Sequence, residues 1–115
     1  MVVDDEPHVR ELLREVLTGE RYEVATFATG AEALDAVPTF HPDVVVVDML
    51  MPGLSGRDVL DALRRASVTV PVILVSGTPQ RVEEGFFRVL VKPFDLRTLA
   101  EAVAAALNHR RSSGA

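Results

Sequence analysis

The stretch His41–Gly56, HPDVVVVDMLMPGLSG, decides the fold of this 115-residue chain. Four consecutive valines, Val44–Val47, lead into Asp48, and an apolar loop with a proline and two glycines follows. A continuous β-branched run bounded by turn residues is typical of a strand buried on both faces of a parallel sheet. Ligands of open α/β sheets bind beyond the carboxyl ends of the strands, so Asp48 stands where chemistry is expected. Taken alone, Asp48 fits equally well as a cap of the next helix.

The size and composition of the chain exclude several classes of protein. A chain of 115 residues, 48% of them hydrophobic, forms one domain that buries its own core. The absence of cysteine excludes disulfides, thiol chemistry and thiolate metal sites. No apolar run is long enough to span a membrane and no signal-peptide pattern is present, so we expect a cytoplasmic protein with no membrane association. The net charge of −5 argues against direct nucleic acid binding by this domain.

Strands and helices are expected to alternate along the chain. The expected strands are residues 1–3, 22–27, 44–48, 68–75 and 88–91. The expected helices are residues 7–19, 29–37, a third that begins at Ser55 and a last one that begins at Asp95. Between the last two strands, Gln80–Gly85 leaves room for one or two helical turns, so the fourth helix is shortened. We expect the domain to span residues 1–111 and residues 112–115 to form a flexible tail.

This alternation predicts an α/β fold. A strand followed by a helix, repeated along the chain, produces a parallel sheet with helices on both faces. Right-handed crossovers and the chain length favour a flavodoxin-like, doubly wound, five-stranded parallel sheet in the order 2-1-3-4-5.

Polar side chains end four of the five expected strands. Asp4 and Asp5 end the first strand, Asp48 the third, and Ser76 and Lys92 the fourth and fifth. Because these strands are contiguous in the predicted order, we expect the side chains to converge on one edge. Three carboxylates repel one another unless a cation is present, and a hard divalent ion such as Mg²⁺ prefers such oxygen ligands. A carboxylate, a metal ion, a lysine and a hydroxyl together suit phosphoryl transfer to an aspartate.

Lys92 is the single lysine of the chain, beside eleven arginines. It follows the last apolar run and precedes a proline. Because arginine carries the other fixed positive charges, we expect Lys92 to serve as a point charge at a particular place.

Four motifs make the chain resemble the receiver domains of two-component response regulators. They are VVDDE at Val2–Glu6, VVVVDMLMPGLSG at Val44–Gly56, VPVILVSGTP at Val70–Pro79 and VLVKPF at Val89–Phe94. The resemblance covers essentially the whole chain. Its most specific elements are D-x-x-M-P-G and K-P-F at these spacings.

The resemblance implies a phosphorelay role. Asp48 would accept a phosphoryl group from a sensor histidine kinase or a phosphotransfer protein, and the domain would signal by a conformational change. Asp4, Asp5, Asp48 and the backbone carbonyl of Leu50 would hold Mg²⁺ or Mn²⁺. The chain would be no enzyme beyond its own phosphorylation and dephosphorylation.

The resemblance also implies roles for the neighbouring residues. Lys92 would pair with the phospho-acceptor and then with the phosphoryl group, and its bond to the following proline would be cis. The hydroxyl of Ser76 would follow the phosphate. The side chains of Leu50 and Thr78 would tune hydrolysis of the acyl phosphate, and the apolar Leu50 offers no hydrogen bond to an attacking water.

Three features depart from the family pattern. The first strand has only Met1–Val3 before the acidic pair, and the segment between Ser76 and Lys92 is short. That segment belongs to the face that most receivers use for dimerisation and output, so the output partner and a homodimer stay open. Val89 stands where the family has a switch aromatic, and whether Phe86 or Phe87 replaces it is also open.

Other functions compete with the phospho-receiver. A phosphorylation-independent, receiver-like protein-binding module fits the shortened segment and Val89. A small aspartate-nucleophile phosphatase needs an acid where this chain has Leu50. Dinucleotide binding is disfavoured because no glycine-rich loop follows the first strand.

Overall fold

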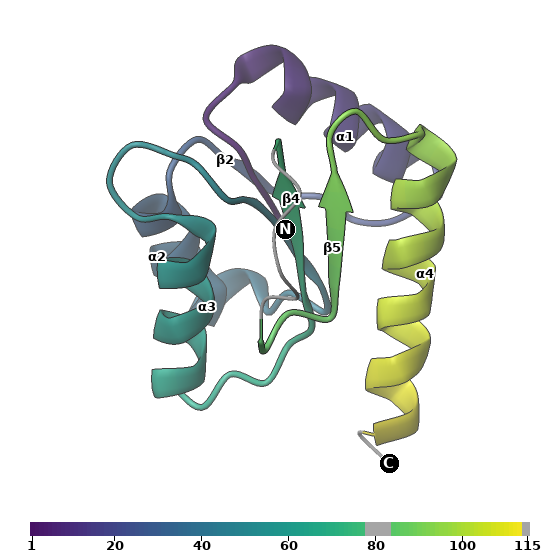
Figure 1. Cartoon of the computed structure of the whole chain (residues 1–115). Helices are drawn as coiled ribbons and strands as arrows, with labels where there is room; N and C mark the ends of the chain where they lie inside the picture. The colour runs from purple at the N-terminus through teal and green to yellow at the C-terminus, as the bar shows by residue number, and fades with distance from the viewer. Residues whose placement is uncertain (78–83, 114–115) are drawn as a thin grey trace.

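A five-stranded parallel sheet with helices on both faces forms the protein (Figure 1). The computed structural model describes residues 1–77 and 84–113. Its strands are β1 (Val2–Val3), β2 (Thr26–Phe27), β3 (Val45–Asp48), β4 (Val72–Ser76) and β5 (Arg88–Val91). The helices in the described ranges are α1 (Pro7–Gly19), α2 (Gly30–Phe40), α3 (Gly56–Arg65) and α4 (Leu96–Ser113).

The sheet has the order β2-β1-β3-β4-β5, so the predicted flavodoxin-like topology is confirmed. All four strand pairs are parallel. In the register, Asp48 lies opposite Val75 and Ser76 lies opposite Val91. The last residues of the three neighbouring strands therefore meet at one edge of the sheet.

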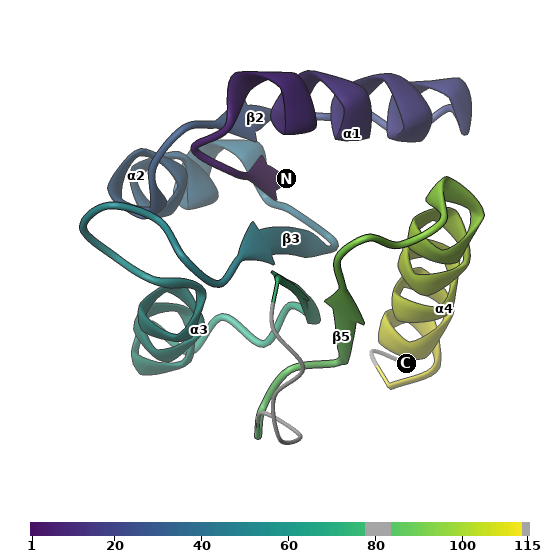
Figure 2. The same ribbon diagram turned by 45° about the horizontal axis from the view of Figure 1, so that its top comes forward.

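The valine run of β3 is buried because helices cover both faces of the sheet. Val45 and Val47 belong to the core cluster that packs against α3, whereas Val44 and Val46 belong to the cluster that includes α1 and α4. Successive side chains of a strand point to opposite faces, so a strand covered on both sides needs an unbroken apolar run. Figure 2 shows α1 and α4 on one side of the sheet and α2 and α3 on the other.

The beginnings of α2 and α3 follow their sequence signals. The hydroxyl of Thr29 accepts a hydrogen bond from the backbone N–H of Glu32 at 3.2 Å. Ser55 accepts from the N–H of Asp58 at 3.2 Å, and Asp58 accepts from the N–H of Ser55 at 2.9 Å. This reciprocal capping box satisfies two N–H groups that have no partner inside the helix.

Several element bounds differ from the sequence-based expectation. The second strand was predicted over residues 22–27, but only Thr26 and Phe27 pair with β1. The fourth strand begins at Val72, because Pro71 has no N–H to donate to the sheet. Helix α2 continues through Pro38 to Phe40 and closes with the N–H of His41 on the carbonyl of Val37 at 3.0 Å.

Two further predictions concern the connection between β4 and β5 and the C-terminal end of the chain. Of the short helix expected at Gln80–Gly85, residues 80–83 lie outside the described residues, and Glu84 and Gly85 form a turn. Helix α4 runs to Ser113, two residues into the stretch expected to be a tail. No helix of the described residues has the length and apolar character needed to cross a membrane.

Candidate functional site

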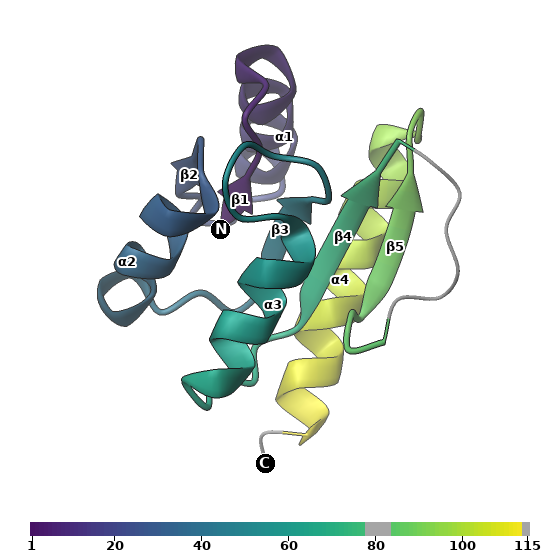
Figure 3. The ribbon, with the colours of Figure 1, turned by 60° about the vertical axis from the view of Figure 1, so that its left-hand side comes forward.

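The polar residues predicted from the strand ends do gather at the carboxyl edge of the sheet. Asp4 follows β1, Asp48 and Ser76 are the last residues of β3 and β4, and Lys92 follows β5. The arrowheads of β4 and β5 point to the same edge in Figure 3. Because all the strands are parallel, their carboxyl ends lie at this one edge.

Three carboxylates form the centre of the site. Ligand atoms of Asp4, Asp5 and Asp48 all lie within 4.8 Å of one another. Asp4 is 1% exposed and Asp48 is 8% exposed, whereas Asp5 is open to solvent. One oxygen of Asp4 accepts from the N–H of Glu6 at 2.9 Å, and the other, Oδ2, is buried without a hydrogen-bond partner among the described residues.

This arrangement fits a hard cation. A buried carboxylate oxygen without a donor is costly, and a metal ion bound there would remove that cost. The donors are all oxygen atoms, which Mg²⁺ and Ca²⁺ prefer, and no thiolate or imidazole is present in the group. The group could therefore hold a divalent metal ion.

The electrostatics of the site disfavour the ionised carboxylates when no cation is bound. Burial raises the pKa of Asp4, and the negative charges of Asp48 and Asp5 raise it further. Burial also raises the pKa of Asp48, while the charge and hydrogen bond of Lys92 oppose that shift. Any added positive charge would lower both pKa values.

Lys92 supplies a positive charge to Asp48. Its Nζ lies 3.3 Å from Oδ1 of Asp48. The peptide bond between Lys92 and Pro93 is cis, as expected. The backbone N–H of Lys92 donates to the carbonyl of Ser76 at 2.7 Å, so the chain that carries the lysine is bonded to the end of β4.

The remaining predicted residues have distinct environments. Ser76 is 2% exposed, at the end of a strand that is buried throughout. Leu50 is 74% exposed and follows β3 by two residues, so its side chain lies in solvent beside the site. Thr78 lies outside the described residues.

The loop after Asp48 requires glycine where it folds back. The N–H of Gly56 donates to the carbonyl of Met49 at 3.0 Å. A Cβ on Gly56 would lie 2.9 Å from the carbonyl oxygen of Asp48 and 2.7 Å from Cδ1 of Leu74. Both distances are too short, so only glycine lets α3 begin this close to the phospho-acceptor candidate.

Arg10 is a site residue that the sequence reasoning missed. Its guanidinium donates to the backbone carbonyl of Asp4 at 2.8 Å. Arg10 lies one turn into α1, after Pro7, and the bond secures the acidic loop to that helix. An arginine in the first turns of the helix after the acidic pair is the only signal that could have indicated it.

The structure places Phe86 and Phe87 at the amino end of β5. Both precede β5, and the N–H of Phe87 donates to the carbonyl of Val72, the first residue of β4. Ser76 is the last residue of β4, so the length of the strand, about 3.3 Å per residue, separates it from these rings. Phe86 and Phe87 thus lie at the opposite end of the β4–β5 pair from Ser76.

Known proteins resemble the chain over nearly its whole length. The family model of the response regulator receiver domain matches residues 1–104. DNA-binding response regulator MtrA of Mycolicibacterium smegmatis is 35% identical, and the match covers 100% of this chain and 53% of MtrA. Transcriptional regulatory protein KdpE of Mycobacterium tuberculosis is 38% identical, over 100% of this chain and 52% of KdpE. The chain thus spans about half the length of these curated relatives.

A solved structure agrees with this assignment. Response regulator protein TrrA of Thermotoga maritima, in complex with Mg²⁺ and BeF, is 35% identical, with a TM-score of 0.84. The match covers 92% of this chain and 96% of that structure. With the 2-1-3-4-5 sheet and the family match to residues 1–104, this chain belongs to the response regulator receiver domain family.

Proposed function

We propose that Asp48 accepts a phosphoryl group from a sensor histidine kinase or a phosphotransfer protein, and that the phosphorylated domain signals by a conformational change. One observation carries the proposal: Asp48 is 8% exposed, lies 3.3 Å from Nζ of Lys92 and has two further carboxylates within 4.8 Å. A carboxylate held beside a cation is a positioned nucleophile. The family supports the same role, because receiver domains belong to two-component signalling.

The transfer is a simple displacement. A carboxylate oxygen of Asp48 attacks the phosphorus of a phosphohistidine, the P–O bond forms, and the P–N bond breaks with its electron pair going to the imidazole. The ammonium of Lys92 stabilises negative charge on the transferring oxygens. Except for this modification and its hydrolysis, the domain is not proposed to be an enzyme.

Asp4, Asp5, Asp48 and the carbonyl of Leu50 are the proposed ligands of Mg²⁺ or Mn²⁺. The unsatisfied oxygen of Asp4 supports a cation at this place. The related structure of TrrA was solved with Mg²⁺ and BeF, which is consistent with that choice. When bound, the metal ion would neutralise charge on the transferring phosphoryl oxygens.

Ser76 is proposed to report the phosphorylation. Its hydroxyl lies at the end of the neighbouring strand and would donate to a phosphoryl oxygen on Asp48. Because the carbonyl of Ser76 is bonded to the N–H of Lys92, a movement of Ser76 would also shift the start of the β5–α4 connection.

Intact-mass spectrometry after incubation with acetyl phosphate and Mg²⁺ tests the proposal. The wild type should gain one phosphoryl group and Asp48→Asn should gain none. Asp35→Asn, which removes an exposed carboxylate from α2, is the matched control and should be modified like the wild type. Equal phosphorylation of wild type and Asp48→Asn would refute the assignment of Asp48.

A phosphorylation-independent binding module is the second candidate. The observation in its favour is Val89, which leaves no aromatic side chain at the usual switch position of β5. A folded wild-type protein that takes no phosphoryl group in the same experiment would favour this alternative.

A further inference from the structure

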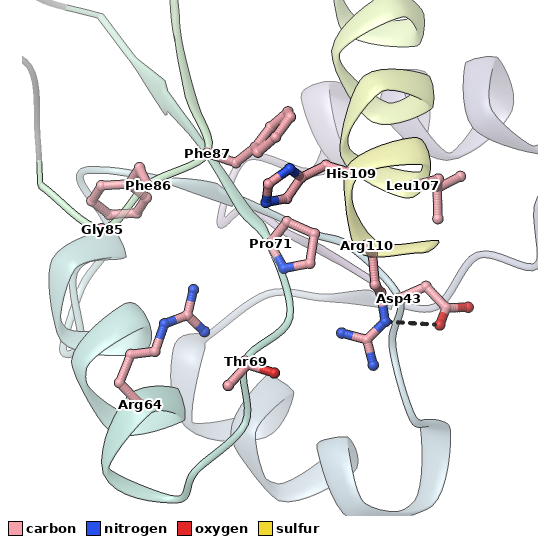
Figure 4. Close-up of a pocket in the computed structure, with 10 residues that line it drawn as sticks. All are labelled: Asp43, Arg64, Thr69, Pro71, Gly85, Phe86, Phe87, Leu107, His109 and Arg110. Atoms are coloured by element: carbon pink, nitrogen blue, oxygen red, sulfur yellow. Dashed lines mark ion pairs between the residues drawn. The ribbon is translucent and has the colours of Figure 1, made fainter. Parts of the chain in front are cut away.

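A cavity lies at the amino ends of the strands, away from the carboxylates. Its volume is about 940 Å³. The walls come from the segments that precede β3, β4 and β5 and from the final turns of α3 and α4 (Figure 4). The phosphorylation chemistry proposed above uses none of these residues.

Positively charged side chains enter this cavity from two helices. Arg64 reaches in from the end of α3 and Arg110 from the end of α4 (Figure 4). Nε of Arg110 lies 3.5 Å from Oδ1 of Asp43, the carboxylate that lines the cavity. His109, next to Arg110, adds an imidazole to the same wall.

Arg64 has N–H donors beyond the one that it uses in the hydrogen bond to Val68. Its Nη1 donates to the carbonyl of Val68 at 2.7 Å, which fixes the side chain at the wall. It forms no ion pair with any carboxylate of the part of the chain that the structure describes. Partial burial lowers its pKa, which is the effect of desolvation without a compensating anion. Its remaining N–H groups can serve a ligand, because a guanidinium carries five donors.

The apolar part of the wall is aromatic. Phe86 and Phe87 both line the cavity. The guanidinium of Arg57 lies 5.1 Å from the ring centre of Phe86, and that of Arg88 lies 5.5 Å from the ring centre of Phe87. These cations contact the rings from outside the cavity, and Arg57 is also paired with Asp61 at 3.6 Å.

We propose that this cavity binds a small ligand that joins a phosphate-type anion to a planar ring, with a nucleoside diphosphate as its representative. Guanidinium groups bind phosphate oxygens in a bidentate manner, and Arg64 and Arg110 can contact them from two sides. The ring would pack against Phe86, which lies on the same face of the sheet as α3 and Arg64. Phe87 packs on the other face, with its ring centre 5.3 Å from that of His109. A volume of about 940 Å³ also matches the usual size of small-molecule sites.

The local charge of the cavity favours anion binding, although the chain as a whole is acidic. The protein has a net charge of −5, yet Arg64 and Arg110 face a single lining carboxylate, Asp43. A weak, non-specific attraction for anions would not be expected of so acidic a molecule. An anion that binds at this amino end would therefore be held by these local groups and not by the net charge.

Isothermal titration calorimetry with ADP in metal-free buffer tests the inference. We expect one ADP per chain, and adenosine and pyrophosphate each to bind at least about tenfold more weakly, because each lacks half of the recognised groups. Arg64→Gln should weaken ADP binding about tenfold or more, as expected for the loss of a hydrogen bond to a charged group. Arg65→Gln, which changes the next residue in the same turn of α3, is the control and should bind like wild type.

Three results would overturn the inference. They are no ADP binding by the folded wild type at millimolar concentration, equal losses in Arg64→Gln and Arg65→Gln, and pyrophosphate binding as tight as that of ADP. Because Arg64 also bonds to the carbonyl of Val68, Arg110→Gln provides a second variant. It should weaken ADP binding about tenfold as well, and unchanged affinity in a folded Arg110→Gln protein would count against the site.

Discussion

The two ends of one sheet carry opposite chemistry. The carboxyl end gathers Asp4, Asp5 and Asp48 around one lysine, whereas the cavity at the amino end is lined by Arg64 and Arg110 with two phenyl rings. A parallel sheet makes this separation simple, because every strand sends its last residue to one edge and its first residue to the other. The net charge of −5 thus combines an acidic end with a cavity lined by more positive than negative side chains.

The two ends also differ in how they are encoded. Asp4 and Asp48 directly follow apolar runs and Asp5 follows Asp4, so the pattern of the strands locates all three in the sequence. The amino-end cavity combines Asp43, Arg64, Phe86 and Arg110, which lie in loops or at the ends of helices. No local pattern marks such residues, and only the packing of α3 and α4 against the sheet brings them together.

The largest expected effect is a loss of overall stability, which would affect the acidic site and the amino-end cavity together. Ile73 is completely buried in β4, an inner strand of the sheet, and contributes to the core shared with α4. Ile73→Ala should reduce the free energy of unfolding by about 2–5 kcal/mol, because it removes packed atoms and leaves a cavity. Urea denaturation measures this change, with Val91→Ala at the partly exposed edge strand as the small-effect control. Equal losses in the two variants would contradict the core that the structure describes.

The next effect should be confined to the acidic end. Lys92→Gln removes the cation 3.3 Å from Asp48 and should slow phosphorylation by acetyl phosphate about a hundredfold, as loss of one charge-stabilising donor commonly does. Lys92→Arg keeps the charge and should lose less. Timed intact-mass measurements give both rates. A change in ADP affinity in Lys92→Gln would contradict the independence of the acidic end and the amino-end cavity.

The acidic end should be a source of instability when no metal is bound. Burial raises the pKa of Asp4 above its usual 3.8, so ionisation is easier in the unfolded chain than in the folded one. The folded state therefore loses stability as the pH rises from 3.8 through the raised pKa. Asp4→Asn should be more stable than the metal-free wild type by about 1–3 kcal/mol at neutral pH, because the amide removes the buried negative charge while it keeps the shape of the side chain.

The pH dependence of that difference is the sharper measurement. Asp4→Asn and wild type should have similar stability below pH 3.8, where Asp4 is protonated in both states, and should diverge above it. Urea titrations of both proteins with EDTA across this range provide the comparison. A difference that is constant with pH would show that the charge of Asp4 is not its cause.

The smallest effect tests whether α3 couples the two ends, since it begins beside Asp48 and carries Arg64 in its last turn. Ser55→Ala removes the hydroxyl that accepts from the N–H of Asp58 and should cost about 1 kcal/mol of stability. We expect unchanged ADP affinity, because the cap lies at the other end of the helix. A loss of ADP binding in folded Ser55→Ala would mean that the ends are mechanically linked. Ser67→Ala, just past the end of α3, is the control for stability.

The sequence supported the topology and the acidic end well. The valine run before Asp48 indicated a strand covered on both faces, and the sheet order and the grouping of Asp4, Asp5 and Asp48 followed from the alternation of elements. The position of Phe86 and Phe87 could not be decided in the same way. Counting residues back from Lys92 does not show which residue first pairs with β4, and only the bond from Phe87 to Val72 does.

The limits of the elements were predictable only in part. Pro38 suggested the end of a helix, yet α2 includes it, since a single missing N–H in the last turn is tolerated when His41 closes the helix. Leu12 fits the apolar spacing of α1 but is exposed, because the helix presents a narrower face to the sheet than the pattern implied. Such outcomes depend on tertiary packing rather than on local propensity.

The single lysine has a practical consequence. Because Lys92 carries the only side-chain amine of the chain, reductive methylation with a ¹³C-labelled reagent would label one side chain, the partner of Asp48, in addition to the N-terminal α-amine. The NMR signal of Lys92 would follow the charge of that carboxylate in real time, without any engineered label. The replacement of lysine by arginine over the rest of the surface thus leaves the acidic end with an intrinsic probe.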